Sequence, residues 1–173
     1  MSDLFSYLIK IMFNSPTKGF LNLDETIKEI IEFINEFPKH EYRLVIGTDS
    51  QPNKNSVDFV NAIVIHRVNS GGRYFWKRIR KEYNYKLQLK ARIFTEANLS
   101  IELALKILPL VQKSLIDVSI KEIPEFELHV DIGQKGKTKE MIKEIVGMVR
   151  GMGFEPKIKP HSYAASTIAD KYA

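Results

Sequence analysis

The feature that most constrains the fold is a nearly unbroken apolar strand that is followed by a hairpin. Residues 42–47, Tyr-Arg-Leu-Val-Ile-Gly, are apolar at almost every position, which is typical of a strand covered on both faces. A second apolar segment, 59–68, leads through the turn sequence Asn-Ser-Gly-Gly at 69–72 into a third, 73–81. So short a loop containing glycine predicts an antiparallel hairpin.

The rest of the chain alternates between helix and strand patterns. Apolar periodicity predicts helices over about 91–115, 138–152 and 162–172, and strands over 126–132 and 157–159. The order of elements is therefore β-β-β-α-β-α-β-α. This order predicts an α/β fold with a mixed five-stranded sheet and helices on both of its faces.

The first part of the chain is expected to form a helical extension, 1–40, that packs on a body formed by 41–173. Turn-forming residues at 14–19 separate a short apolar arm from a helix. That helix is predicted to begin near Asp24, as its N-cap, and to end before Pro38.

Composition bounds the class of protein. The 173 residues are about one domain's worth of chain, and 44% hydrophobic with 27% charged residues is an ordinary globular composition. The lack of cysteine excludes disulfide scaffolds and thiolate catalysis. No apolar run reaches the roughly 18–20 residues of a membrane helix, and the N-terminus lacks the basic head of a signal peptide. We therefore expect a cytoplasmic protein without membrane association, and the net charge of +5 mildly favours a polyanionic partner.

Several acidic residues fall where solubility alone does not explain them. Asp49 and Asp131 each follow an apolar strand, at the edge where open α/β sheets bind ligands. Glu96 borders the apolar face of the first long helix, whereas Glu102 lies on a solvated face of that helix. Asp170 lies near the C-terminus of the last helix, where the helix dipole disfavours negative charge. These breaches of local rules mark a candidate site.

Converging carboxylates would repel one another, and divalent cations remove that repulsion. All-oxygen ligands suit Mg²⁺ or Mn²⁺. Two such ions roughly 3.5–4 Å apart activate water and stabilise a leaving oxygen in phosphodiester cleavage. The expected cofactors are therefore two Mg²⁺ or Mn²⁺ ions.

Four short motifs, together with the order of these acidic residues, resemble a known family. The motifs are Ser15-Pro16-Thr17-Lys18-Gly19, Gly47-Thr48-Asp49-Ser50-Gln51, Gly71-Gly72-Arg73-Tyr74-Phe75-Trp76 and Ser162-Tyr163-Ala164-Ala165-Ser166. Over about residues 42–173 the chain resembles the ribonuclease H-like superfamily of nucleases, integrases and resolvases. Over nearly its whole length it resembles the YkuK-like family of predicted ribonuclease H-related proteins.

The resemblance implies a ribonuclease H-like fold and a catalytic metal site. In it Asp49 would bridge both ions, Glu96 and Asp131 would complete the site, and Asp170 or a nearby histidine would assist the second ion. Asp170 departs from the family pattern because it lies about two turns into its helix. The implied activity is hydrolysis of phosphodiester bonds in RNA, RNA/DNA hybrid or structured DNA, leaving 5′-phosphate and 3′-hydroxyl ends.

The segment 73–92 holds eight basic residues interleaved with aromatic ones, and two interpretations are open. The segment can hold phosphates and stack bases, with Lys86, Lys90 and Arg92 favoured because they lead into the helix of Glu96. Alternatively it contains a strand whose aromatic residues face the core and whose cations face water. Beside Asp49, the residues Ser50 and Gln51 are further substrate-binding candidates.

The turn at 133–138 lies between a strand and a helix and imitates a phosphate-binding loop. Only two residues separate its glycines, where a P-loop has four. Lys137 and Thr138 remain candidates for contact with a substrate phosphate at a helix N-terminus. His129, which alternates with Asp131, and His161 are candidate accessory residues, although a buried structural role is the stronger expectation for His129.

Three functions are therefore open at this point. The leading hypothesis is a divalent-metal-dependent nuclease acting by a two-metal mechanism. The alternative is a nucleic-acid-binding module that keeps the fold without turnover, and a third is a nucleotide phosphohydrolase that uses residues 133–138. No feature of the sequence indicates an oligomeric state.

Overall fold

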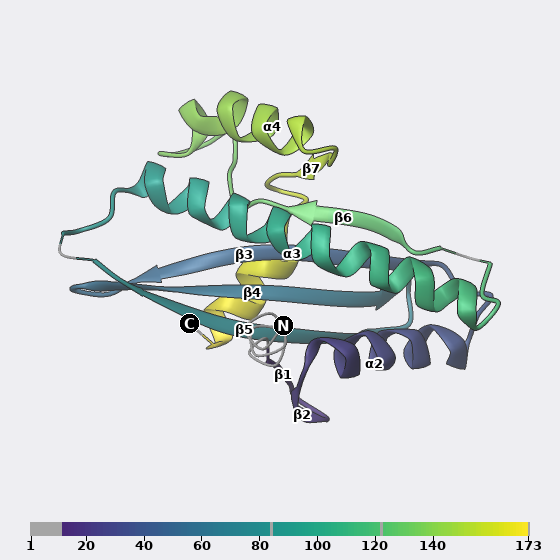
Figure 1. Ribbon diagram of the computed structural model, residues 1–173. Coiled ribbons are helices and arrows are strands. Elements are labelled where there is room, and N and C mark those ends of the chain that lie inside the picture. The colour runs from purple at the N-terminus through teal and green to yellow at the C-terminus, as the bar shows by residue number, and fades with distance from the viewer. Residues whose placement is uncertain (1–11, 84, 122, 173) are drawn as a thin grey trace, which may run out of the picture.

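The computed structural model describes residues 12–83, 85–121 and 123–172, and the backbone alone at 164–165 and 169–170 (Figure 1). The strands are β1 (Phe13–Ser15), β2 (Gly19–Leu21), β3 (Tyr42–Pro52), β4 (Ser56–Arg67), β5 (Gly72–Glu82), β6 (Glu125–His129) and β7 (Pro156–Lys157). The helices are α2 (Leu23–Glu36), α3 (Leu89–Asp117), a 3₁₀ turn η1 (Lys139–Met141), α4 (Ile142–Gly151) and α5 (Ala164–Tyr172).

Within these described ranges, seven strands form one mixed sheet in the order β2-β1-β5-β4-β3-β6-β7. β3, β4 and β5 are antiparallel neighbours, which confirms the predicted hairpin. β6 runs parallel to β3, and β7 runs parallel to β6. The prediction of a mixed α/β fold with helices on both faces is confirmed.

The predicted number of five strands is wrong, because residues 13–21 form two more. The turn that we expected between an arm and a helix closes the short hairpin of β1 and β2, and Gly19 adopts the positive φ of 73° that this turn requires. The hairpin joins the outer edge of β5, where Asn14 pairs with Trp76. Strands of three residues are too short to show a period in the sequence. The division into 1–40 and 41–173 stays a prediction.

Helix α2 begins at a capping box rather than at Asp24. The Glu25 amide donates to Asn22 Oδ1 at 2.9 Å, and the Asn22 amide donates to Glu25 Oε2 at 2.7 Å. Two backbone amides that the helix leaves unpaired are satisfied in this way. Asn22 is therefore the N-cap, and the helix ends at Glu36, before Pro38, as expected.

The two faces of the sheet carry different layers. On one face, alternate residues of β3 such as Leu44 and Ile46 enter the main core, which the apolar sides of α2 and α3 cover (Figure 1). On the other face, Val60 and Ala62 pack with Ile168 of α5 in a smaller cluster. Among the helices that the structure describes, none is long and apolar enough to span a membrane.

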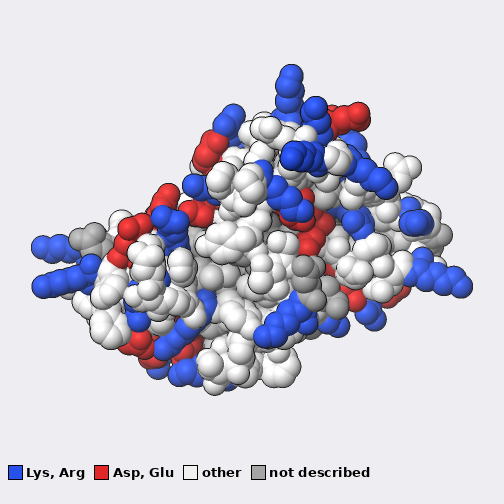
Figure 2. All heavy atoms as spheres, turned by 180° about the vertical axis from the view of Figure 1, so that it is seen from behind, with Lys and Arg blue, Asp and Glu red and all other residues white. Residues whose placement is uncertain are grey.

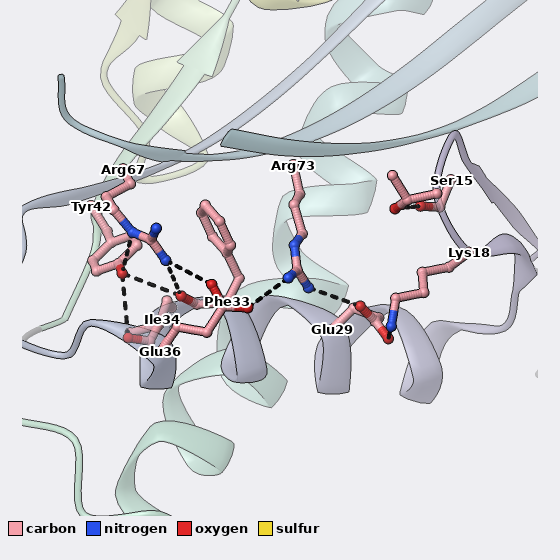
Figure 3. Close-up of polar contacts among 10 residues, drawn as sticks. Ser15, Lys18, Glu29, Phe33, Ile34, Glu36, Tyr42, Arg67 and Arg73 are labelled. Carbon is pink, nitrogen blue, oxygen red and sulfur yellow. Dashed lines mark hydrogen bonds and ion pairs between the residues drawn. The ribbon is translucent and has the colours of Figure 1, made fainter. Parts of the chain in front are cut away.

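A cluster of opposite charges, which we term the anchor cluster, fixes α2 to the β4–β5 hairpin (Figure 3). Arg67 is 7% exposed and donates to the Phe33 carbonyl at 2.8 Å and to Glu36 at 3.1 Å. Arg73 donates to Glu29 at 3.0 Å and to Glu36 at 2.7 Å. The anchor cluster is Glu29, Glu36, Arg67 and Arg73, and in it every charge meets one of opposite sign.

Candidate metal and active site

The register of β3 and β6 brings two aspartates to neighbouring positions. Gly47 pairs with His129 in the parallel ladder. Asp49 and Asp131 are each two residues further along the chain, and Asp49 shares its face of β3 with Gly47, because residues two apart on a strand share a face. β3 continues for three residues past Asp49, whereas β6 ends two residues before Asp131. Both carboxylates therefore lie at the carboxyl end of this pair of strands.

Glu96 reaches the same end of the sheet from α3, on the opposite face. Its side chain is 2% exposed, and its Oε1 accepts a hydrogen bond of 2.5 Å from Ser50 Oγ. Its Oε2 is buried and has no hydrogen-bond partner among the residues that the structure describes. Ser50 neighbours Asp49 but points to the α3 face, while its amide donates to Asp49 Oδ1 at 2.8 Å. One carboxylate oxygen thus stays buried without a donor, which is costly.

The electrostatics connect the three acidic groups. Burial is the largest reason that the pKa of Glu96 is raised to about 8, against an ordinary value of 4.5. The hydrogen bond from Ser50 opposes this shift, and so does the charge of Arg92. The negative charges of Asp49 and Asp131 raise the pKa of Glu96 further. Because such interactions act over short distances inside a protein, the three carboxylates influence one another.

Asp131 already has a cationic neighbour. Lys159 Nζ lies 2.9 Å from Asp131 Oδ1. The Lys159 amide donates to the Ile132 carbonyl at 2.8 Å, which fixes its backbone beside the end of β6. Its stem packs on Gly133, where a β-carbon would lie only 3.0 Å from Lys159 Cβ. Sequence reasoning missed Lys159, because nothing in its neighbourhood in the chain pairs it with residue 131.

We use the term acidic site for Asp49, Glu96 and Asp131. The described part of the chain contains no group of three or more His, Asp or Glu side chains already arranged to hold a metal ion. The residues nevertheless fit a hard divalent cation, because the donors are all oxygens and Glu96 Oε2 is buried without a donor. The backbone of Asp170 is in α5, but its side chain lies outside the described residues. The assignment of these four residues as metal ligands stays a prediction.

The two histidines have different surroundings. His129 is 1% exposed, and its Nε2 lies 2.8 Å from Glu127 Oε2. Burial lowers the pKa of His129, and Glu127 opposes that shift. These surroundings are those of a structural histidine held by a buried carboxylate. That carboxylate, Glu127, was not among the candidates named from the sequence. His161 lies exposed in the turn before α5.

The basic segment fits neither of its two interpretations completely, because β5 divides it between both faces of the sheet. Arg73 belongs to the anchor cluster, and Arg80 forms a pair of 2.7 Å hydrogen bonds with Asp58. Arg78 donates to the Tyr172 carbonyl. Aromatic residues also lie on both faces: Phe75 is in the main core, whereas Trp76 stacks on Tyr172 of α5 at 4.3 Å between ring centroids.

The residues predicted to bind substrate are spread around the acidic site. Gln51 and Lys86 are exposed, and Arg92 is half-buried close enough to affect Glu96. Lys90 forms an ion pair of 2.8 Å with Glu144 of α4. Figure 2 shows the face opposite to that of Figure 1, where Lys and Arg side chains border a small group of acidic ones near its centre.

The turn at 133–138 differs from its predicted form. The helix that we expected from Thr138 begins as the 3₁₀ turn η1 and becomes α-helical at Ile142. The Gly133 amide donates to Thr138 Oγ1 at 3.2 Å, so this hydroxyl closes the turn. Lys137 is exposed. Nothing in this arrangement favours the nucleotide phosphohydrolase hypothesis.

Comparisons with known proteins agree with this architecture. The family described as "Ribonuclease H-like" matches residues 25–173. A protein of Bacillus subtilis (strain 168), named "Uncharacterized protein YkuK", is 34% identical over 88% of this chain and 95% of its own length. No solved structure matches the chain significantly.

Proposed function

Because the chain belongs to the ribonuclease H-like family, we propose that it is a divalent-metal-dependent nuclease. Its substrates are RNA, RNA/DNA hybrid or structured DNA, and its cofactors are Mg²⁺ or Mn²⁺. The observation that carries the proposal is the buried Glu96 Oε2, which has no hydrogen-bond donor among the described residues. The negative charges of Asp49 and Asp131 also raise the pKa of Glu96. A buried carboxylate of this kind is unfavourable unless it binds a proton or a cation, and a divalent cation satisfies all three acidic groups at once.

The residues of the chain have separate tasks in this proposal. Asp49, Glu96 and Asp131 supply the oxygen ligands, and Asp170 is the candidate for the fourth. When bound, the divalent ions supply Lewis acidity toward the phosphodiester and make a water molecule more acidic. Ser50 holds one oxygen of Glu96 by its 2.5 Å hydrogen bond, which leaves the other oxygen for the acidic site.

Lys159 contributes a fixed positive charge next to the acidic site. Its ammonium lies 2.9 Å from Asp131 Oδ1 and its side chain is 54% exposed. A charged donor at the rim of such a site can also bind a phosphate oxygen of the substrate. Lys159 therefore has two tasks: it neutralises Asp131 in the free protein and can bind substrate in the complex.

Cleavage of labelled nucleic acids tests the proposal. We would incubate the protein with RNA, RNA/DNA hybrid and branched DNA in Mn²⁺, and compare the wild type with Asp49→Asn. The control is Asp117→Asn, which removes an exposed aspartate at the end of α3. We expect products from the wild type and the control only. Equal cleavage by Asp49→Asn would show that the assigned role is wrong.

The ion pair of Lys159 and Asp131 also suits a second candidate function. With one acidic group already neutralised, the fold can serve as a nucleic-acid-binding module without turnover. Such a module would bind nucleic acid without metal, with a steep dependence on salt. In the cleavage experiment it would give binding but no products with any of the substrates.

A further inference from the structure

One cation of β5, Lys77, lies beside an aromatic ring and lines a cavity. Arg73 and Arg80 on the same strand each meet a carboxylate at 3.0 Å or less. The Lys77 ammonium instead lies 5.5 Å from the centroid of the Phe13 ring. Among the residues that the structure describes, no acidic group forms a hydrogen bond or an ion pair with Lys77. Lys77 shares the α3 face of the sheet with Phe75, and it is half-buried.

Lys77 lines a cavity of about 180 Å³ between the β4–β5 hairpin and α3. Lys106 and Glu102 of α3 line the same cavity, and Asn61 of β4 borders it. The space is large enough for several water molecules or for one phosphate group. Two ammonium groups and one carboxylate give this cavity a net positive charge.

The electrostatics of the cavity favour an anion. Burial lowers the pKa of Lys77, the charge of Lys106 lowers it further, and Glu102 opposes the shift. Two like charges that face one space repel each other, and a bound anion removes that repulsion. A phosphate oxygen can accept hydrogen bonds from both ammonium groups.

The cavity lies next to the acidic site along α3. Lys106 is ten residues from Glu96, which is about 15 Å at the rise of an α-helix. Asn61 Oδ1 accepts a 2.9 Å hydrogen bond from Thr48, the residue before Asp49. Ser100 Oγ donates to Thr48 at 2.8 Å and to the Glu96 carbonyl at 3.0 Å. The polar side chain that borders the cavity is thus fixed to the strand and helix that carry the acidic site.

We propose that Lys77 and Lys106 form a phosphate-binding site, which takes a backbone phosphate of the nucleic-acid substrate a few nucleotides from the bond that is cleaved. The assignment to a polynucleotide rests on the proposed function. A free phosphate or a mononucleotide presents the same chemistry, so the experiment has to separate these sources.

Binding without cleavage tests the site. We would measure the affinity of the three labelled nucleic acids in EDTA, over a series of salt concentrations, for the wild type, Lys77→Met and Lys106→Met. The control is Lys113→Met, an exposed lysine of α3 that does not line the cavity. Each substitution in the cavity should weaken binding several-fold and reduce the slope of log affinity against log salt by roughly 0.7–0.9. The control should show a smaller change in both quantities.

A second measurement identifies the source of the phosphate. Inorganic phosphate should raise the melting temperature of the wild type more than that of Lys77→Met. If it does so while both variants bind nucleic acid as the wild type does, the phosphate site is supported and its assignment to a polynucleotide is overturned. If neither nucleic acid nor phosphate distinguishes the cavity variants from Lys113→Met, the site itself is overturned.

Failure of the phosphate site and failure of the nuclease proposal give different results in these experiments. Binding that weakens in the cavity variants, without cleavage by the wild type in Mn²⁺, would overturn the nuclease and support the site. Cleavage by the wild type with unchanged binding in the variants would support the nuclease and overturn the assignment of the site to a polynucleotide. Lys106 is exposed, so its variant carries the test if Lys77→Met does not fold.

Discussion

The anchor cluster and the acidic site use charged side chains in opposite ways. In the anchor cluster two arginines meet two glutamates, and Arg67 also lies 4.1 Å from the centroid of the Phe33 ring. In the acidic site three carboxylates influence one another, and Lys159 is the cation that lies at hydrogen-bond distance from Asp131. The first arrangement is complete by itself and serves stability. The second brings like charges close to one another, and such a breach of a local rule is expected at a functional site.

The largest effect that separates the two regions is expected in catalysis. Asp49→Asn should lower the rate of cleavage in Mn²⁺ by about 100-fold or more, because losing a metal ligand or its support costs at least that factor. It should leave the unfolding free energy equal or slightly higher, because it removes a charge that repels Glu96. Single-turnover cleavage and urea denaturation measure the two quantities. If Asp49→Asn lost as much stability as a variant of the anchor cluster, the proposed difference between the two regions would be wrong.

The reverse pattern is expected in the anchor cluster. Arg67→Met should lower the unfolding free energy by about 3 kcal/mol, because it leaves Glu36 and the Phe33 carbonyl without their donor. Cleavage by the folded fraction should not change. The exposed pair of Lys28 and Glu32, 3.8 Å apart, is the matched control, and Lys28→Met should change stability by less than about 0.5 kcal/mol. Urea denaturation measures the unfolding free energy of each variant, and a cleavage assay measures its activity.

The pH dependence of stability should come from the acidic site. The folded-state pKa of Glu96, about 8, lies above its unfolded value of 4.5. Between these values the folded state binds more protons, so stability falls as the pH rises from about 4.5 to 8, by at most about 1.4 kcal/mol per unit. Denaturation at several pH values should show this slope in the metal-free wild type and not in Glu96→Gln. Parallel curves for the two proteins would exclude a raised pKa.

The smallest effect is expected at Lys159. Lys159→Met removes the cation beside Asp131, so Mn²⁺ should bind about fivefold more tightly, which corresponds to about 1 kcal/mol. Lys157→Met is the control, since Lys157 lies 3.9 Å from Glu127 instead. Calorimetric titration gives both affinities. Weaker Mn²⁺ binding in Lys159→Met than in the control would mean that Lys159 supports the metal rather than competing with it.

Long periodic segments were predictable, and short or long-range features were not. The predicted helix over 91–115 is present as α3, because its apolar period is long. The hairpin formed as predicted, because a short loop containing glycine joins two apolar segments. β1 and β2 have three residues each and no period. The N-cap predicted at Asp24 is wrong: the cap is Asn22, and the capping box that it forms with Glu25 joins residues only three apart in the chain.

The residues of the candidate site could be named from the sequence, but the contacts between them could not. Asp49, Glu96 and Asp131 stood out because each breaks a local rule. The hydrogen bond between Ser50 and Glu96 joins residues 46 apart in the chain, and the ion pair of Lys159 depends on β7 lying beside β6. Contacts of this kind come from the tertiary fold, so the pattern of one segment does not contain them.

The most direct test of the acidic site is a crystal soaked in Mn²⁺, with the metal located by its anomalous scattering. The account predicts density between Asp49, Glu96 and Asp131, with Glu96 Oε2 among the ligands and the Lys159 ammonium displaced from Asp131. Mn²⁺ that binds only elsewhere, or an acidic site that stays empty at millimolar Mn²⁺, would contradict it.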